Sequence, residues 1–388
     1  MIWLHGAQIL GGAVKSIGIQ EGRIATICDL EVPRSTASGC ALHFENCLVF
    51  PGLINSHDHL DFNLFPRLGN RIYANYVEWG RDIHAANWKE IAAVLKVPRE
   101  LRWRWGIYKN LLNGVTTVVN HGPRLSCSDA AVTVFQKCYN LHSVMQETRW
   151  RWRLNRPIAM PWPYVIHVGE GTDAGAQEEI ETLLRWNLFK RRLIAIHGVA
   201  LTAAQAASFA ALIWCPVSNF FLLNKTADVT KLGKSTRIIF GTDSTLTTGW
   251  NIWEQLRFAR GLGMMPDEAL FRAVTRTPGQ VWKLHDCGEL REGFQADIVV
   301  ARRPKTGEDY AAFFNINPED IVLAISRGRI VLCDEVRYQQ TGAAGSTADL
   351  YRVDLEYGSR YVAGNLTALI GEIRKYAPEL NFHPSTVS

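Results

Sequence analysis

Two histidines one residue apart, His57 and His59, follow an apolar run that extends from Leu48 to Ile54. The run predicts a strand, and alternate residues of a strand point to the same face, so both imidazoles could bind one cation. Most isolated His-x-His pairs are ordinary surface or polar positions, and this pair alone is weak evidence for a metal site. Other residues further along the chain strengthen it.

Three further residues that can bind a metal lie at the ends of predicted strands: His167, His197 and Asp243. In a parallel barrel the carboxyl ends of the strands form the rim where active sites assemble. A metal ion held there by His57, His59, His167 and Asp243 would have three imidazoles and one carboxylate, which suits zinc or ferrous iron. A solvent molecule would complete the coordination.

A carboxylate three residues after His167, Glu170, could act on a substrate without binding the metal. It could pass a proton from the attacking water to a leaving nitrogen, as hydrolysis of an amine or amide requires. The alternative is a loop carboxylate that the dipole of a helix predicted from Ala176 stabilises mildly. We favour the catalytic role because of its place beside His167.

His197 and Asp243 each have a structural alternative. A lone histidine at the end of an apolar strand is often a core residue, but beside a metal-bound water His197 could orient the hydroxide or stabilise an oxyanion. An aspartate near a glycine is often only a turn former. After the last predicted barrel strand, however, Asp243 could bind the metal and accept a proton from the bound water.

The composition is that of an ordinary globular protein, with 388 residues, 47% apolar and 20% charged, and a net charge of +5. This length predicts one large barrel, or a barrel with a smaller domain. Cysteines without any Cys-x-x-Cys pair argue against a zinc ribbon or a disulfide framework and favour reduced thiols in the cytoplasm. No apolar run approaches about 18 residues and residues 1–11 do not resemble a signal segment, so we expect a soluble protein without a membrane partner.

The densest basic stretch, Arg149 to Arg156, alternates arginines with Trp150 and Trp152. Nucleic acid binding could use such a stretch, but a wall of stacked Arg and Trp side chains beside a pocket is the simpler interpretation. We therefore expect a small-molecule substrate and no nucleic acid partner.

Strand and helix patterns alternate from about residue 51, which predicts parallel strands with crossover helices. The strands predicted in this region are Leu48–Ser56, Val115–Asn120, His142–Gln146, Tyr164–Val168, Leu193–His197, Leu212–Cys215 and Arg237–Gly241. The predicted helices are Pro98–Leu112, Ala176–Leu188, Ala203–Ala210, Asn251–Gly261 and Asp267–Leu284. Short strands precede the region at Ile2–Leu4, Val14–Ile19, Arg23–Cys28 and Ala41–Phe44, and follow it at Asp297–Ala301, Ile321–Ser326 and Arg329–Leu332.

The two flanking β segments are each too small to stand alone, so we expect residues 1–50 and 290–340 to form one composite β domain. A barrel over residues 51–289 would be inserted between them. Residues 341–388 are expected to form a linker, rich in Gly, Ala and Ser from about Gly342, and a helix from Tyr361 to Tyr376.

Several motifs together resemble the amidohydrolase superfamily. They are Pro51-Gly52-Leu53-Ile54-Asn55-Ser56-His57-Asp58-His59, His167 with Glu170, His197-Gly198-Val199-Ala200-Leu201-Thr202, Pro216-Val217-Ser218-Asn219 and Gly241-Thr242-Asp243-Ser244. The chain is most similar to the mononuclear aminohydrolase branch, which includes guanine, cytosine and S-adenosylhomocysteine deaminases and the triazine chlorohydrolases. A later segment, Gly293 to Val300, resembles the strand by which such chains re-enter their small β domain. The resemblance covers about residues 1–335.

The resemblance implies an α/β fold, a (β/α)8 TIM-like barrel with a small composite β-sandwich domain formed by both chain ends. It implies one divalent metal ion, zinc or ferrous iron, bound by His57, His59, His167 and Asp243. Glu170, His197 and Asp243 would be the catalytic residues. No lysine obviously ends a fourth strand, which is where binuclear branches place a carbamylated bridging ligand, so one metal ion is favoured over two.

The chain departs from the branch at three places. Trp214 stands where the branch usually has the histidine of His-Cys-Pro, so a substrate contact made by that histidine is absent or replaced. The interval from Gln146 to Tyr164 leaves little room for a third helix, a fourth strand and a fourth helix, so the barrel could be incomplete there. Leu60 to Trp88 has no pattern that maps to a known substrate and is a candidate lid.

Four residues are candidates for substrate contact: His121, Glu147, Trp214 and Asn219. His121 and Glu147 follow predicted strands at the same rim, and each could equally be an ordinary loop residue. Trp214 and Asn219 belong to the motif region that departs from the branch.

The leading hypothesis is a metal-dependent aminohydrolase that deaminates a nitrogen heterocycle. A metal-bound hydroxide would attack an amidine-like ring carbon, Glu170 would protonate the adjacent ring nitrogen, and ammonia would leave. The same machinery could instead cleave a cyclic amide or a carbon–halogen bond. A third alternative is a binding protein that lost catalysis, although none of the metal-ligand or proton-transfer positions is broken. The sequence leaves the oligomeric state open, with a homodimer as one option.

Overall fold

The computed structural model describes residues 1–29, 39–127, 130–158, 160–341 and 349–384. Residues from both ends of the chain share one mixed ten-stranded sheet. Its strands are β1 (Ile2–Ile9), β2 (Val14–Gln20), β3 (Arg23–Cys28), β4 (Cys40–His43), β5 (Cys47–Pro51), β14 (Ile298–Arg302), β15 (Ile321–Ser326), β16 (Arg329–Cys333), β17 (Leu350–Leu355) and β18 (Gly358–Ala363). The antiparallel pair of β5 and β14, with Val49 opposite Val300, joins the two ends of the chain.

The eight strands between these ends are all parallel and lie in two sheets. One sheet has the order β6 (Leu53–Asp58), β7 (Val115–Asn120) and β8 (Thr133–Phe135). The other has the order β13 (Arg237–Phe240), β12 (Ala211–Trp214), β11 (Leu193–His197), β10 (Tyr164–Val168) and β9 (Tyr139–Ser143). The two sheets contact each other where β6 meets β13. Because helices cover them, most of these strands are buried along their whole length, and β10, β11 and β12 are mainly apolar.

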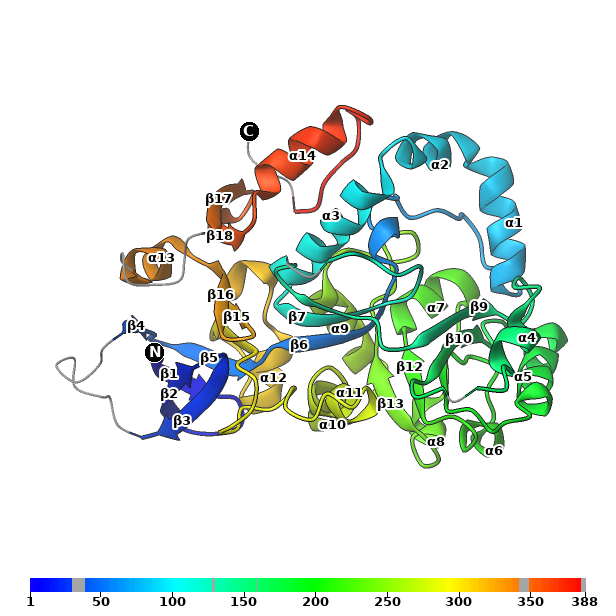
Figure 1. Ribbon diagram of the computed structural model, residues 1–388, viewed down its shortest axis with the longest axis horizontal. Helices are drawn as coiled ribbons and strands as arrows, with labels where there is room; N and C mark the ends of the chain where they lie inside the picture. The colour runs from blue at the N-terminus through cyan, green and yellow to red at the C-terminus, as the bar shows by residue number, and fades with distance from the viewer. Residues whose placement is uncertain (30–38, 128–129, 159, 342–348, 385–388) are drawn as a thin grey trace.

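Helices separate most of the parallel strands (Figure 1). The helices are η1 (Leu60–Phe62), α1 (Tyr76–Ala86), α2 (Trp88–Leu95), α3 (Arg99–Leu112), α4 (Trp150–Leu154), α5 (Ala174–Trp186), α6 (Ala203–Ala206), α7 (Pro216–Leu223), α8 (Val229–Leu232), α9 (Ile252–Gly261), α10 (Asp267–Ala273), α11 (Arg276–Val281), α12 (Asp309–Phe314), η2 (Pro318–Asp320), α13 (Glu335–Thr341) and α14 (Leu366–Arg374). Figure 1 shows the ten-stranded sheet at one end of the molecule and α1 at the other. Among the described residues, no helix is long and apolar enough to cross a membrane.

Two predicted elements are each two elements in the structure. The strand predicted at Leu48–Ser56 is β5 and β6, which belong to different sheets and meet at Gly52, where a Cβ would lie 2.2 Å from the Thr116 hydroxyl. The helix predicted at Asp267–Leu284 is α10 and α11. Pro278 has no N–H to donate to the Val274 carbonyl, which accepts a hydrogen bond from the Ile54 N–H at 2.7 Å instead.

The structure also corrects the predicted positions of the middle strands. The strand predicted at His142–Gln146 lies at Tyr139–Ser143, and the short strand β8 precedes it with no helix between them. The crowding that the sequence indicated between Gln146 and Tyr164 is resolved because β9 begins earlier and α4 is only five residues long. Arginines and tryptophans stack at α4, as predicted, with the Arg151 guanidinium 4.8 Å from the Trp186 ring centroid.

The helix predicted at Tyr361–Tyr376 is wrong in its first part. Tyr361 and Val362 lie in β18, which pairs with β16 and β17, so the expected domain boundary at residue 340 is too early for this sheet. Gly364, with φ +79°, ends the strand, and α14 begins after the Asn365 N-cap. The linker predicted from about Gly342 falls mainly on residues 342–348, which lie outside the described residues.

Candidate metal centre and substrate cavity

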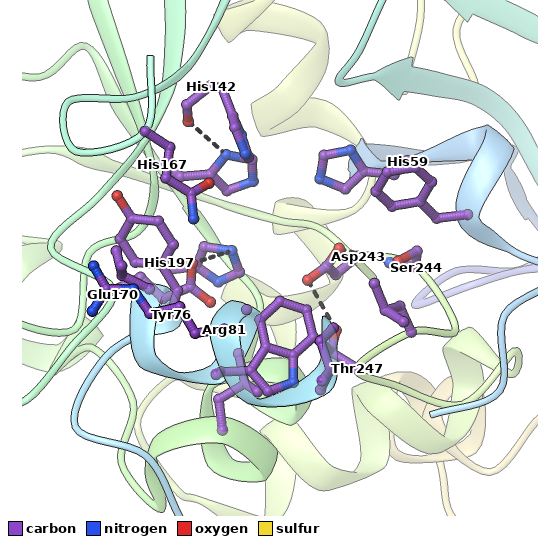
Figure 2. A pocket seen from close by; sticks show the side chains of 18 of the residues that line it. His59, Tyr76, Arg81, His142, His167, Glu170, His197, Asp243, Ser244 and Thr247 are labelled. Atoms are coloured by element: carbon purple, nitrogen blue, oxygen red, sulfur yellow. Dashed lines mark hydrogen bonds and ion pairs between the residues drawn. The ribbon is translucent and has the colours of Figure 1, made fainter. Parts of the chain in front are cut away.

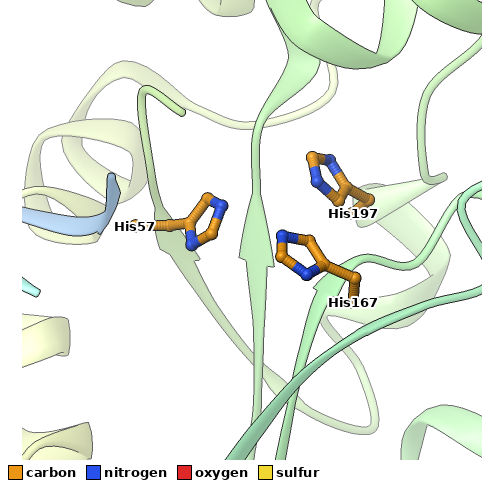
Figure 3. A group of neighbouring side chains, drawn as sticks. All are labelled: His57, His167 and His197. Atoms are coloured by element: carbon orange, nitrogen blue, oxygen red, sulfur yellow. The ribbon is translucent and has the colours of Figure 1, made fainter. Parts of the chain in front are cut away.

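The predicted metal ligands come together although they are spread over almost 190 residues of sequence. His57 lies in β6, His59 follows β6, and His167 lies in β10. The ring centroid of His57 is 4.9 Å from that of His59 and 5.1 Å from that of His167. Asp243 follows β13, and its Oδ1 lies 3.7 Å from His57 Nε2. Figure 3 shows the rings of His57, His167 and His197 grouped together. The ligand atoms of His57, His59 and Asp243, and separately those of His57, His167 and His197, lie within 4.8 Å of one another.

The donor set fits a divalent metal ion. His57 is 1% exposed, and its Nε2 atom has no hydrogen-bond partner within the described structure. A buried polar atom without a partner is costly unless something else binds it. Burial, with the neighbouring histidines, holds the pKa values of His57 and His167 well below their ordinary value, so both imidazoles are neutral, which metal ligation requires.

Hydrogen bonds also fix how the ligands point. His167 Nδ1 lies 2.9 Å from the His142 carbonyl oxygen, so Nδ1 carries the proton and Nε2 is left for a metal. Asp243 accepts from the Ser244 N–H and from the hydroxyls of Ser218 and Thr247 at 2.7–3.0 Å. Although burial alone would raise the pKa of Asp243, His59, His197 and these hydrogen bonds hold it below its ordinary value, so the carboxylate is ionised.

Glu170 and His197 face each other beside these ligands. His197 Nε2 lies 3.5 Å from Glu170 Oε2, and both side chains are buried. His197 Nδ1 donates to Asn219 Oδ1 at 2.7 Å, which leaves Nε2 of the neutral ring as an acceptor. Burial, with the charges of Asp243 and Glu179, raises the pKa of Glu170 well above its ordinary value, so this carboxyl group can hold a proton at neutral pH.

Two of these residues have an unusual backbone conformation. His197 and Asp243 have φ values of +66° and +60°, in the left-handed region that residues other than glycine rarely adopt. Each such conformation costs of order 1 kcal/mol and persists only where the surroundings enforce it. Because both residues point their side chains at the same place, the strain supports a functional assignment for both.

A cavity of about 760 Å³ opens onto Glu170, His197 and Asp243. Figure 2 shows these side chains with His59, His142 and His167 around it. The apolar lining comes mainly from η1, α1, α7 and the loops after β9 and β13, with Phe62, Tyr76, Trp79, Met145, Leu222 and Leu246. The segment Leu60 to Trp88, for which the sequence suggested a lid, therefore forms one wall of the cavity.

A second cavity, of about 590 Å³, lies on the other side of His59 and Phe62, which line both cavities. His121 and Glu147, two of the predicted substrate contacts, line this second cavity. His121 is buried, and its Nδ1 has no hydrogen-bond partner within the described structure. Glu147 is already paired with Arg153 and accepts from the His142 N–H at 2.8 Å, so it shapes the wall.

The other two predicted substrate contacts are placed differently. Trp214 is fully buried, and its Nε1 donates to the Thr226 hydroxyl at 2.8 Å, so it lines neither cavity. Trp214 therefore belongs to the core and does not face the substrate cavities. Asn219 is also fully buried. Its side-chain oxygen accepts from His197 Nδ1, and its amide nitrogen donates to the Thr226 hydroxyl at 3.0 Å.

Sequence reasoning missed three residues that the structure places at the site. His142 lines both cavities, and its ligand atom lies within 4.8 Å of those of His121 and His167. Glu179 of α5 accepts from the Gly169 N–H and the Tyr76 hydroxyl, both at 3.0 Å, behind Glu170. Lys109 of α3 is buried beneath the ligands. With the correct bounds of β9, His142 would have been recognised as a histidine at the carboxyl end of a strand. Glu179 and Lys109 lie on amphipathic helices, and no local pattern separates them from exposed charged residues there.

Known proteins share both this fold and part of this sequence. Residues 163–331 match the model of the amidohydrolase family. This matched segment is somewhat less than half of the chain. It is 26% identical to a 5-methylthioadenosine/S-adenosylhomocysteine deaminase from Caldicellulosiruptor saccharolyticus, over 44% of this chain and 46% of that protein. The match thus spans about half the length of this curated relative.

Solved structures resemble this chain along most of its length. Atrazine chlorohydrolase from Arthrobacter aurescens TC1, complexed with zinc, has a TM-score of 0.71 at 15% identity, covering 97% of this chain and 100% of that one. An adenosine deaminase from Xanthomonas campestris with bound zinc has a TM-score of 0.69 at 15% identity, covering 97% and 98%. Guanine deaminase from C. acetobutylicum has a TM-score of 0.62 at 13% identity, covering 84% and 99%. At these identities the likeness concerns the fold.

Proposed function

We propose that this protein is a member of the amidohydrolase family, and that it is a metal-dependent aminohydrolase that removes ammonia from a nitrogen heterocycle. The observation that carries the proposal is the position of Glu170, a buried carboxyl group with a raised pKa that faces His197 at 3.5 Å beside a set of neutral imidazoles. This pair can move protons on a substrate in the 760 Å³ cavity. The names of the deaminases among its relatives and fold neighbours support the choice of reaction.

His57, His59, His167 and Asp243 would hold the metal ion in this proposal. Imidazole and carboxylate ligands suit zinc, and ferrous iron is the alternative. Zinc is favoured because it is named in solved structures of the same fold. A bound divalent ion supplies Lewis acidity and lowers the pKa of water to about 7, which makes a nucleophile available at neutral pH.

The chain's own residues would carry the proton transfers. Protonated Glu170 donates from its carboxyl oxygen to a ring nitrogen of the substrate, and as a carboxylate it takes a proton from the attacking water. His197 Nε2 accepts a hydrogen bond from the same water, because Asn219 holds the proton on Nδ1. The apolar wall of η1 and α1 encloses the heterocycle and reduces its contact with bulk water.

The proposed architecture behind this site is a (β/α)8 barrel with a β domain made by both chain ends. Eight parallel strands, β6 to β13, and the contact of β6 with β13 support closure of the two sheets into a barrel. His57, His167, His197 and Asp243 would then lie at the carboxyl ends of its first, fifth, sixth and eighth strands.

The test is ammonia release by zinc-loaded protein on a panel of aminopurines, aminopyrimidines, pterins and triazines. The Glu170→Gln protein serves as the matched blank, because it keeps the shape of the side chain but cannot exchange a proton. We expect release by the wild-type protein on at least one ring class, and a fall of several orders of magnitude in Glu170→Gln with zinc content unchanged.

Two other outcomes would contradict the proposal. Near-normal turnover by Glu170→Gln would remove Glu170 from proton transfer. Chloride release from a chlorotriazine, or opening of a cyclic amide, without ammonia from any amine would show that the same residues serve another hydrolysis. Chloride and ring-opened product are therefore measured in the same reactions.

A further inference from the structure

The metal ligands come from two sheets that no strand ladder joins at this point. β6 carries His57, and Asp243 follows β13, and within the described residues the hydrogen-bonded strand order ends at both β6 and β13. The two strands are nevertheless very close. A Cβ at Gly241 would lie 2.6 Å from His57 Cβ, so only glycine permits this approach. Contacts other than a strand ladder must therefore fix the spacing of the ligands across the boundary between β6 and β13, which we call the seam.

Polar side chains take the place of the ladder at the seam between β6 and β13. The Asn55 side chain accepts from the Thr242 N–H at 3.0 Å and donates to the Thr242 hydroxyl at 2.8 Å. The Asp243 N–H donates to the His57 carbonyl at 3.0 Å. Asn63 accepts from the Thr245 N–H at 3.2 Å. These bonds satisfy buried backbone groups that a strand partner would otherwise satisfy.

A buried ion pair lies at the centre of this seam. Lys109, from α3, is 2% exposed, and its ammonium donates to Asp58 Oδ2 at 3.1 Å and to the Asp243 carbonyl at 3.0 Å. The same ammonium lies 3.4 Å from the Thr242 hydroxyl, so all three of its N–H groups have a partner. It therefore contacts the segment between His57 and His59 and the segment of Asp243 at once.

Side chains of the protein surround the Asp58 carboxylate. It is 0% exposed, and besides Lys109 it accepts from Asn110 and Asn63, each at 2.8 Å. Neither Lys109 nor Asp58 lines the two cavities beside the histidines. Both residues act through others, and a buried ion pair that adds little net stability can still select one arrangement of the groups around it.

We propose that Lys109 and Asp58 are positioning residues that hold the His57–His59 segment and the Asp243 segment at the spacing one metal ion needs. The proposal rests on the proposed function, because it assumes that these residues bind a metal. Groups that hydrogen-bond to metal ligands or fix their backbone typically contribute 10- to 100-fold to metal affinity. Lys109 does so for two ligand-bearing segments from one atom.

The test separates positioning from plain stabilisation with a charge-balanced double variant. Lys109→Met and Asp58→Asn each leave one charge buried without a partner, so we expect both single variants to unfold at lower urea concentration than the wild type in metal-free form. The double variant, Lys109→Met with Asp58→Asn, buries no charge and should recover most of that loss. Its zinc dissociation constant, measured by competition with a chelating dye, should stay about 10- to 100-fold above the wild-type value.

Tyr108→Phe is the matched control, since Tyr108 precedes Lys109 on α3 and its hydroxyl donates to the Ala363 carbonyl at 3.1 Å, away from the ligands. Its zinc dissociation constant should equal that of the wild type. A double variant with wild-type zinc affinity would overturn the positioning role, and so would one that stays as unstable as the single variants. A wild-type protein that binds no zinc would overturn the proposed metal site and this inference together. Wild-type zinc affinity in the double variant would overturn this inference alone.

Discussion

Among single residues, the neighbours of each buried carboxyl group decide its protonation state and so its chemistry. Glu170 and Asp243 are both buried carboxyl groups, yet their pKa values move in opposite directions. Burial and two nearby carboxyl groups, those of Asp243 and Glu179, disfavour the ionised form of Glu170. Two histidines and three hydrogen-bond donors favour the ionised form of Asp243. One carboxyl group therefore holds a proton while the other stays a carboxylate, which is the division of roles that an acid and a metal ligand require.

Glu179, behind Glu170, gives a prediction about pH. Burial raises its pKa from 4.5 to about 7 despite hydrogen bonds from the Gly169 N–H and the Tyr76 hydroxyl. A raised pKa means that the folded state favours the protonated form, so its contribution to stability is complete below pH 4.5 and is lost as the pH rises through about 7. We expect the free energy of unfolding of the metal-free protein to fall over this interval, by up to about 3 kcal/mol from this group.

Glu179→Gln cannot ionise and should lack that part of the pH dependence in urea unfolding series. Glu178→Gln, at the exposed neighbouring position of α5, is the control and should keep the wild-type slope. Identical slopes in all three proteins would show that Glu179 does not titrate in this range.

At the scale of elements, the strands that end at the site were predictable and the wall of the cavity was not. β7, β10 and β11 have the predicted bounds, because each is a short run rich in Val, Ile and Leu that is buried along its length. Helix α1 has only two buried residues, Tyr76 and Ile83, so its apolar pattern is weak. Its place beside Glu170 follows from contacts with α5 and not from its own pattern.

The cap of α1 links two walls of the site and can be tested. Asn75 accepts from the N–H groups of Val77 and Glu78 and donates to Asp173 at 2.6 Å, which in turn caps α5. Asn75→Ala should lower the free energy of unfolding by about 1 kcal/mol, and should also raise KM, because α1 lines the cavity.

Asn365→Ala removes a comparable cap from α14, which lies against α3 and far along the chain from the cavity residues. It should lower stability by a similar amount and leave KM unchanged. A KM that Asn75→Ala does not move would mean that the position of α1 does not affect substrate binding. Urea unfolding and initial rates on the best substrate of the panel supply both quantities.

At the scale of the whole molecule, the metal should add stability that the protein alone lacks. The proposed ligands come from β6 in one sheet and from β10 and the segment after β13 in the other, so a bound ion would cross-link the two sheets. A ligand that binds only the folded state at 100 times its dissociation constant adds about 2.7 kcal/mol. We expect chelation to lower the thermal midpoint and re-addition of zinc to restore it.

His57→Ala is the control for that experiment, because it removes the proposed ligand whose Nε2 has no hydrogen-bond partner among the described residues. Its midpoint should be insensitive to both chelator and zinc. A wild-type midpoint that does not respond to zinc, measured by scanning calorimetry, would count against a metal site at these residues.

The amino-acid sequence was enough to identify residues that could do the chemistry and most of the strands that end beside them. His57, His59, His167, Glu170, His197 and Asp243 were found from spacing, strand ends and resemblance, because strand burial and strand-end position leave a local signal. The fold is needed to assign what Trp214, Asn219, Lys109, Glu179 and His142 do. The partners of the first four, such as Thr226, His197, Asp58 and Gly169, lie outside their own helix or strand, and no local pattern encodes which of the other elements a buried group will meet.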